Sequence, residues 1–253
     1  MKITFLGTGT SQGVPVIGCT CAVCQSLDFR DKRLRTSVYV EVDGQHLVFD
    51  TGPDFRQQML RERISRLDAV IFTHEHKDHT AGLDDVRAFN FRQKKEMPLY
   101  GHARVLAQLQ REFAYAFGEM KYPGAPLLAL HEISNTPFSI GGVELQPIEV
   151  FHYKLPVFGF RIGDFTYITD TNAIPETEKE KIRGSKVLVL DALQQQPHIS
   201  HFTLQEAIAV AQELQAEQTY LIHISHRMGL HQDVSRQLPP GIALAWDGLK
   251  LVL

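Results

Sequence analysis

The chain has 253 residues, of which 43% are hydrophobic and 22% charged, and this balance is typical of a folded globular protein. Its 26 basic residues are outnumbered by 29 acidic ones, so the net charge of -3 gives no general attraction for nucleic acid. No apolar run approaches the roughly 18 residues of a membrane helix. The strand-like start at Ile3 leaves no room for a signal peptide, so we expect a cytoplasmic protein without a membrane partner.

Predicted strands and helices are interleaved along the chain. Apolar, β-branched runs predict strands at 3–6, 38–42, 46–49, 69–72, 143–150, 158–162, 165–168, 187–190, 219–222 and 249–253. Helical spacing predicts helices at 53–63, 102–117, 176–183 and 203–214, the last one opened by a capping box of Thr203 and Glu206. Asp-Gly at 43–44 and Gly-Asp at 163–164 are predicted hairpin turns.

This order favours a layered α/β fold over an all-β sandwich or a helical bundle. No linker-like tract divides the chain, so we expect one domain over residues 1–253. The run Tyr-Pro-Gly-Ala-Pro at 122–126 is a break that marks a pseudo-boundary between two β-rich halves.

One short segment concentrates potential metal ligands. Residues 74–79 read His-Glu-His-Lys-Asp-His, directly after the predicted buried strand at 69–72. Alternate side chains of an extended segment share a face, so His74 and His76 can bind one ion. Asp78 and His79, on the turn that follows, can then reach a second ion. Because position 78 is not a histidine, the segment does not match the helical motif of single-zinc peptidases.

Further candidate ligands follow other strand-like runs. His152 and His223 can each complete one coordination shell, and the two oxygens of Asp170 can bridge both ions. Nitrogen and oxygen ligands of this kind suit zinc, manganese or iron. Two such ions, about 3.5–4 Å apart, activate a shared water near neutral pH and polarise a phosphoryl or carbonyl oxygen. The sequence therefore predicts a hydrolase, in which Asp50 and Thr51 orient ligands rather than bind metal.

A second metal site is predicted near the N-terminus. Cys19, Cys21 and Cys24 are the three cysteines of the chain, and three cysteines cannot all pair as disulfides within it. A tetrahedral zinc needs a fourth ligand, for which His226 is the best candidate. It lies three residues after His223, so in an extended chain the two rings face opposite ways.

The pattern His-x-His-x-Asp-His, followed in order by three further ligands, resembles the metallo-β-lactamase superfamily from residue 2 to the C-terminus. The resemblance implies a four-layered αββα sandwich with a dinuclear site at its edge. The residues that match the ligands of the first metal are His74, His76 and His152. Those that match the ligands of the second are Asp78, His79 and His223, with Asp170 in the bridging place.

Within the superfamily, Gln-Gly-Val-Pro at 12–15, the Cys-x-Cys-x-x-Cys segment and Ile-Ser-His at 224–226 resemble the PhnP group of phosphodiesterases, which open phosphoribosyl cyclic phosphate. The resemblance implies a structural zinc on the cysteines and His226. It also implies that His201, before an x-x-Leu segment, protonates the leaving group, although His198 is a second candidate. The region 87–120 has no obvious counterpart in the group, and we expect it to cover the cleft.

We therefore expect a phosphodiesterase that uses a metal-bridging hydroxide on a small phosphodiester, with Asp78 and His201 as catalytic residues. A homodimer is expected by fold analogy alone. Two other functions stay open. A transfer-RNA-processing endonuclease shares the dinuclear motif but would need a basic surface to bind the RNA backbone. A binding or carrier protein resembling the pyrroloquinoline quinone biosynthesis protein B shares the cysteine segment but has a degraded dinuclear motif.

Overall fold

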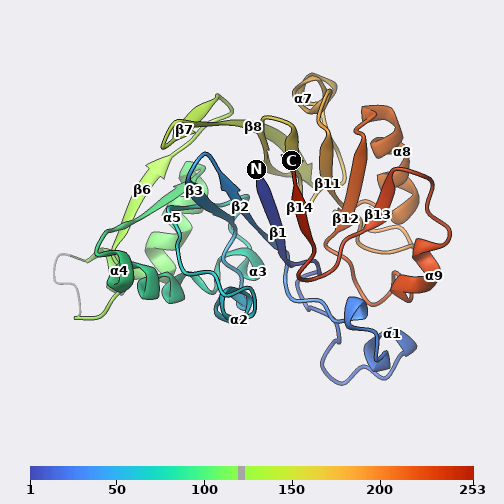
Figure 1. Ribbon diagram of the computed structural model, residues 1–253, viewed down its shortest axis with the longest axis horizontal. Coiled ribbons are helices and arrows are strands. Elements are labelled where there is room, and N and C mark those ends of the chain that lie inside the picture. The colour runs from blue at the N-terminus through green and yellow to red at the C-terminus, as the bar shows by residue number, and fades with distance from the viewer. Residues whose placement is uncertain (119–122) are drawn as a thin grey trace.

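In the computed structural model, which describes residues 1–118 and 123–253, two seven-stranded β-sheets pack face to face and helices cover their outer faces (Figure 1). This confirms the predicted four-layered αββα fold. The larger helices follow strands of the sheet that they cover, because two neighbouring parallel strands must be joined by a crossover connection, which is usually a helix. The site therefore forms from loops at the strand ends.

The first sheet has the order β14-β1-β2-β3-β4-β5-β6. Its strands are β1 (Lys2–Gly7), β2 (Ser37–Val42), β3 (Gln45–Phe49), β4 (Ala69–Ile71), β5 (Met97–Gly101), β6 (Leu128–Glu132) and β14 (Lys250–Val252). From β3 to β6 the strands are parallel. Its helices are α2 (Phe55–Arg61), α3 (Lys77–Thr80), α4 (Arg87–Gln93), α5 (Ala103–Glu112) and α6 (Ala114–Phe117), with the 3₁₀ turn η2 (Leu83–Val86).

The second sheet has the order β13-β12-β11-β10-β9-β8-β7. Its strands are β7 (Phe138–Ile140), β8 (Val143–His152), β9 (Leu155–Ile162), β10 (Phe165–Tyr167), β11 (Val187–Asp191), β12 (Gln218–Ile222) and β13 (Ile242–Leu244). Its helices are α7 (Glu176–Ile182), α8 (Leu204–Leu214) and α9 (His231–Ser235). The N-terminal excursion between β1 and β2 carries α1 (Ala22–Gln25) and the 3₁₀ turn η1 (Phe29–Asp31) and lies near α9 in Figure 1. No described helix is long and apolar enough to cross a membrane.

Three apolar clusters correspond to the three interfaces between the four layers. The central one joins the two sheets, where the Phe49 ring of β3 lies 5.3 Å from the Tyr167 ring of β10 and 5.5 Å from the Phe160 ring of β9. The other two lie between each sheet and its own helices. Because strands of both sheets are buried on both faces, they read in the sequence as continuous apolar runs.

Several edge elements differ from the sequence prediction. The predicted helix at 102–117 is two helices, since Phe113 leaves the helical conformation between α5 and α6. The region 87–118 packs as outer helices and strand β5 on the first sheet, and Arg104 of α5 pairs with Glu75 of the ligand segment at 2.6 Å, so its role as a cover over the cleft stays a prediction. Residues 119–122, which include the end of that region and the start of the predicted break, lie outside the described residues.

Helix α8 begins with the predicted capping box. The Thr203 side chain accepts from the Glu206 N–H, while the Glu206 carboxylate accepts from the Thr203 N–H at 2.8 Å. We expect Thr203→Ala to lower the free energy of unfolding by about 1 kcal/mol, because a helix N–H loses its partner. Chemical denaturation would measure the loss. Gln205→Ala, at an exposed position of the same turn, is the control, and equal stability of the two variants would contradict the assignment.

Candidate metal centre

The predicted ligands meet at one edge of the sandwich, where strands of both sheets end. His74 lies three residues beyond β4, and His152 is the last residue of β8. Asp170 lies three residues beyond β10, and His223 directly follows β12. Strands β8, β10 and β12 run in the same direction, so their carboxyl ends share this edge. The fold thus gathers side chains that are almost 150 residues apart in the chain.

Four of the predicted ligands form a first cluster. His74, His76, His152 and Asp170 place one donor atom each within 4.8 Å of the others. Nε2 of His74 lies 3.0 Å from Nδ1 of His76 and 3.7 Å from Oδ2 of Asp170. Three imidazole nitrogens and a carboxylate oxygen at this spacing fit one divalent ion.

A second cluster shares Asp170 with the first. It contains Asp78, His79, Asp170 and His223, again within 4.8 Å of one another. Nε2 of His79 lies 3.3 Å from oxygens of both Asp78 and Asp170, and Nε2 of His223 lies 3.3 Å from Asp170. All seven residues predicted as dinuclear ligands are therefore together, with Asp170 between the two groups.

Two ring nitrogens of the second cluster have no hydrogen-bond partner among the described residues, as expected of atoms that bind a metal ion. Nε2 of His79 and Nε2 of His223 are buried and make no hydrogen bond with any described group. Burial works to lower the pKa of His79, but the carboxylates of Asp170 and Asp78 raise it well above its usual value. A buried centre that attracts a proton so strongly is suited to a divalent cation in its place.

Buried groups behind the clusters fix the ligand rings. Nδ1–H of His79 donates to Oδ2 of Asp50 at 2.8 Å, which leaves Nε2 to face the centre. Burial raises the pKa of Asp50, whose oxygens also accept from the N–H and hydroxyl of Thr73. Nδ1–H of His152 donates to the carbonyl oxygen of Ser200 at 2.9 Å. The expectation that Asp50 orients a ligand rather than joins a metal cluster is confirmed, and the backbone N–H of Thr51 similarly holds the carbonyl of His79.

Backbone strain marks the same strand ends. Asp50, Asp170 and His223 have φ values of +64°, +55° and +56°, in the left-handed region that residues with side chains adopt rarely. Such conformations persist where the surroundings enforce them, and they concentrate at functional sites. Here each one turns a strand sharply, so that its side chain points along the edge into the centre or toward a ligand.

His201 lies against the two ligand clusters. Its ring centroid is 4.5 Å from that of His152 and 4.7 Å from that of His223. Nδ1–H of His201 donates to Oδ1 of Asp191 at 3.1 Å, and burial would lower the pKa of His201, but Asp191 raises it to about 9. The alternative candidate, His198, is more exposed, and its Nδ1 lies 3.4 Å from the backbone nitrogen and the hydroxyl of Ser200.

Asp191 stands out in the sequence only as one of several residues that end a strand. In the structure it is the last residue of β11, is fully buried and lies 3.4 Å from Nδ1 of His223 as well as against His201. One carboxylate therefore accepts a hydrogen bond from the predicted proton donor and lies close to a predicted ligand, whose Nδ1 makes no hydrogen bond with the described residues. The sequence feature that could have identified Asp191 as a site residue is its position, since it follows an apolar run as Asp170 does.

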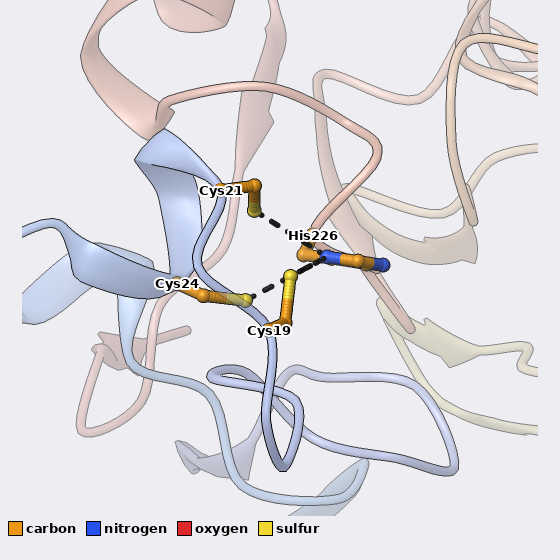
Figure 2. A group of neighbouring side chains, drawn as sticks. All are labelled: Cys19, Cys21, Cys24 and His226. Atoms are coloured by element: carbon orange, nitrogen blue, oxygen red, sulfur yellow. Dashed lines mark hydrogen bonds between the residues drawn. The ribbon is translucent and has the colours of Figure 1, made fainter.

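The cysteine cluster is brought together with His226 as predicted (Figure 2). Nδ1 of His226 lies 3.2, 3.4 and 3.6 Å from the sulfurs of Cys19, Cys21 and Cys24. The edges of a Zn–S₃N tetrahedron are about 3.5 Å, given Zn–S bonds near 2.3 Å and Zn–N bonds near 2.0 Å. The backbone N–H of Cys24 and the His226 ring lower the pKa of Cys21 to about 6, which favours the thiolate that binds zinc.

Comparison with known proteins agrees with this geometry. Residues 45–224 match the family model described as beta-lactamase superfamily domain. A crystal structure described as a new diphosphatase from the PhnP family has a TM-score of 0.93 and 42% identity, with 100% of this chain and 97% of that chain covered. The chain thus belongs to the metallo-β-lactamase superfamily and, within it, to the PhnP family.

Two further similar proteins show which properties cannot be assigned to this chain by similarity. An octanoyltransferase of Porphyromonas gingivalis is 39% identical over 256 residues, which cover 100% of this chain and 52% of that protein. The chain spans about half the length of the first curated relatives it matches, so their names describe larger proteins. The zinc-bound PqqB structure of Methylobacterium extorquens has a TM-score of 0.80 at 20% identity over 100% of both chains, and this likeness shows the fold alone.

Proposed function

We propose that the chain is a metal-dependent phosphodiesterase that opens cyclic phosphates, such as phosphoribosyl cyclic phosphate, or cleaves related small phosphodiesters. The observation that carries the proposal is the pair of ligand clusters joined at Asp170. Two divalent ions bound there, zinc or manganese or iron, would activate a water and neutralise the charge that develops on the phosphoryl oxygens. The resemblance to a PhnP-family diphosphatase supports attack at phosphorus.

Asp78 and His201 are the chain's own catalytic groups in this proposal. Burial would raise the pKa of Asp78, but His79 and His223 hold it far below its usual value, so the group is a carboxylate at neutral pH. As a carboxylate it can accept a hydrogen bond from the attacking water and fix its direction. His201 keeps its Nδ1–H on Asp191, so Nε2 is the atom that gives a proton to the departing oxygen.

We expect His201→Ala to lower kcat by about 10³-fold on a diester with an alkyl alcohol as leaving group, because the alkoxide then departs without a proton. On bis(p-nitrophenyl) phosphate the fall should be under about tenfold, since the phenolate needs little protonation. Steady-state kinetics on both substrates would measure the difference. His198→Ala is the matched control and should keep both rates, whereas equal losses on the two substrates in His201→Ala would remove its role as acid.

The substrate assay separates this function from the alternatives. Metal-loaded protein would be tested on bis(p-nitrophenyl) phosphate, ribosyl and nucleoside cyclic phosphates, a nucleoside diphosphate, a thioester and a lactone. Hydrolysis of the diesters that chelation abolishes and added metal restores is the expected result. Absence of metal-dependent diester turnover would overturn the proposal, and preferential cleavage of the diphosphate would place the activity with that of the PhnP-family diphosphatase.

The two alternative functions receive less support. A carrier resembling PqqB would not need both ligand clusters complete, yet all seven ligands are in place. A transfer-RNA endonuclease would be favoured by a basic surface, which the net charge of -3 does not suggest. We therefore propose a small-molecule substrate in the cytoplasm, and the homodimer stays a prediction whose measurement is the mass in solution.

A further inference from the structure

A hollow of about 450 Å³ opens beside the first ligand cluster. Its lining residues are His76, His152, Tyr153, Lys154, Leu155, Ile199 and Ser200. Beyond the two histidines, the mechanism gives no task to its lining side chains. Tyr153 is 50% exposed and Ile199 is 67% exposed, although both are large and mainly apolar. Apolar side chains that gather in a hollow beside reactive groups are typical of a surface that contacts a ligand.

The backbone of Tyr153 is in an unusual conformation. Tyr153 and Lys154 form the two-residue turn between β8 and β9, because His152 pairs with Leu155. Tyr153 has φ +59°, a value at which glycine, asparagine or aspartate is the usual residue. A bulky aromatic side chain in this position is strained, and strain of this kind concentrates where a side chain has a functional task. The turn thereby places an aromatic ring one residue after the predicted ligand His152.

Asn172 links the two sides of the hollow. Its Oδ1 accepts from the backbone N–H of Tyr153 at 2.8 Å, and its Nδ2 donates to the carbonyl oxygen of Ile199 at 3.1 Å. The next carbonyl along that loop, of Ser200, holds His152. The backbone segments that carry the aromatic ring and the aliphatic side chain are therefore held in a fixed relation to each other and to the first cluster.

Lys154 adds a positive charge to this apolar surface. Its Nζ lies 5.3 Å from the centroid of the Tyr153 ring. No carboxylate within residues 1–118 and 123–253 forms an ion pair with it. An aromatic ring, an aliphatic side chain and a free ammonium group together match a flat organic ring that is attached to a phosphate.

We propose that this hollow binds a nucleobase, so that among the small phosphodiesters of the proposed function the chain prefers a nucleoside phosphodiester, cyclic or open, to one without a base. The proposal rests on the proposed function for the bond that is broken, but base binding can be measured without turnover. Stacking of a base on an aromatic side chain depends little on which base is present, so we expect purines and pyrimidines both to bind.

The test compares adenosine 5′-monophosphate with ribose 5-phosphate, which has a hydroxyl at C1′ in place of the base, by calorimetric titration of the metal-loaded chain. We expect the nucleotide to bind at least about tenfold more tightly, the gain expected from one stacked base. Tyr153→Ala should reduce that preference to about twofold and leave ribose 5-phosphate within twofold of its original affinity. Tyr153→Phe should keep the preference, because the ring remains.

Tyr153→Asn separates binding from folding. Asparagine adopts the left-handed conformation readily, so the thermal unfolding midpoint should stay equal or rise while the nucleotide preference is lost. Leu60→Ala, at a residue of similar exposure on α2, is the control and should bind both probes as the unchanged chain does. Equal affinity of the two probes, or an unchanged preference in Tyr153→Asn, would overturn the proposal. A nucleotide preference without turnover of any diester would instead overturn the proposed function and leave the base site standing.

Discussion

Replacing Asp170 with asparagine should lower kcat/KM for phosphodiesters by about 10³-fold. Asp170 belongs to both ligand clusters, with Oδ1 3.3 Å from Nε2 of His79 in the second cluster and Oδ2 3.7 Å from Nε2 of His74 in the first. An amide keeps one carbonyl oxygen but presents an NH₂ group to the other side, so it cannot bridge two cations. The substitution also removes a negative charge that would stabilise cations among the imidazoles. A loss of several kcal/mol of transition-state stabilisation corresponds to this fall in rate.

The same variant should hold fewer metal ions. After equilibration with excess manganese or zinc, the metal content measured by elemental analysis should be lower than that of the unchanged protein by about one ion per chain. Asparagine tolerates the φ of +55° at this position, so the backbone can stay as it is. Asp164→Asn, on the exposed turn between β9 and β10, is the matched control. Full activity with an unchanged metal content in Asp170→Asn would show that no carboxylate bridge exists.

The sequence predicts the site residues that belong to a local pattern, but it does not predict contacts that form only when distant segments pack together. Residues 74–79 are a local pattern, so their ligands can be named from the sequence. His152, Asp170 and His223 can be named because each follows a run of apolar residues, and parallel strands place their carboxyl ends at one edge. The double contact of Asp191 with His201 and His223 has no local signature, since it depends on how β11 and the loop after it are placed in space.

The same reasoning explains the elements that the sequence pattern does not reveal. Strand β13 has three residues, and strand β6 reads Leu-Ala-Leu-His-Glu without a β-branched residue, so neither has a clear strand pattern. Both lie at the edge of a sheet, where pairing with one neighbour defines them. Strands β4 and β11 are buried on both faces and are predicted, whereas β5, which lies inside the first sheet, reads Met-Pro-Leu-Tyr-Gly without a β-branched residue and is not. Phe91 and Tyr115 are exposed at 64% and 46%, because helices α4 and α6 each bury one face.

The free ammonium and aromatic ring at the turn after β8 could not be predicted as a pair either. Tyr153 carries no strand or helix signal of its own, and its strain appears only with the backbone angle. The metal-binding chemistry can therefore be found from the sequence, while the expected substrate preference comes from three-dimensional packing.

Loss of the zinc that we propose for the cysteine cluster should destabilise the chain strongly. The three cysteines and His226 lie 202 to 207 positions apart in the sequence, so an ion between them closes a very long loop. A disulfide that closes a loop of this length removes up to about 5 kcal/mol of unfolded-state entropy, and metal clips act in the same direction. We expect Cys24→Ser to lower the free energy of unfolding by about 3–5 kcal/mol, which corresponds to a fall of about 10 °C in the thermal unfolding midpoint.

Cys24 is suited to this test because its thiol is the most buried of the three, at 6% exposure. Burial raises its pKa to about 11, whereas Cys21 has a pKa of about 6. Zinc must therefore displace a proton from Cys24 across the neutral range, so zinc affinity should rise with pH and fall as the solution is acidified. Zinc release measured with a chromogenic chelator between pH 6 and pH 8 would show the direction.

Thr20→Ala is the control for Cys24→Ser, because Thr20 is exposed in the same loop and has no sulfur ligand to lose. It should keep its zinc and its unfolding midpoint. Both variants should keep the dinuclear ions at 10 °C, but Cys24→Ser should lose diesterase activity first on warming, because His226 and the ligand His223 lie on one short segment after β12. A zinc-free Cys24→Ser chain that melts at the original temperature would show that the ion does not hold the N-terminal excursion to this segment.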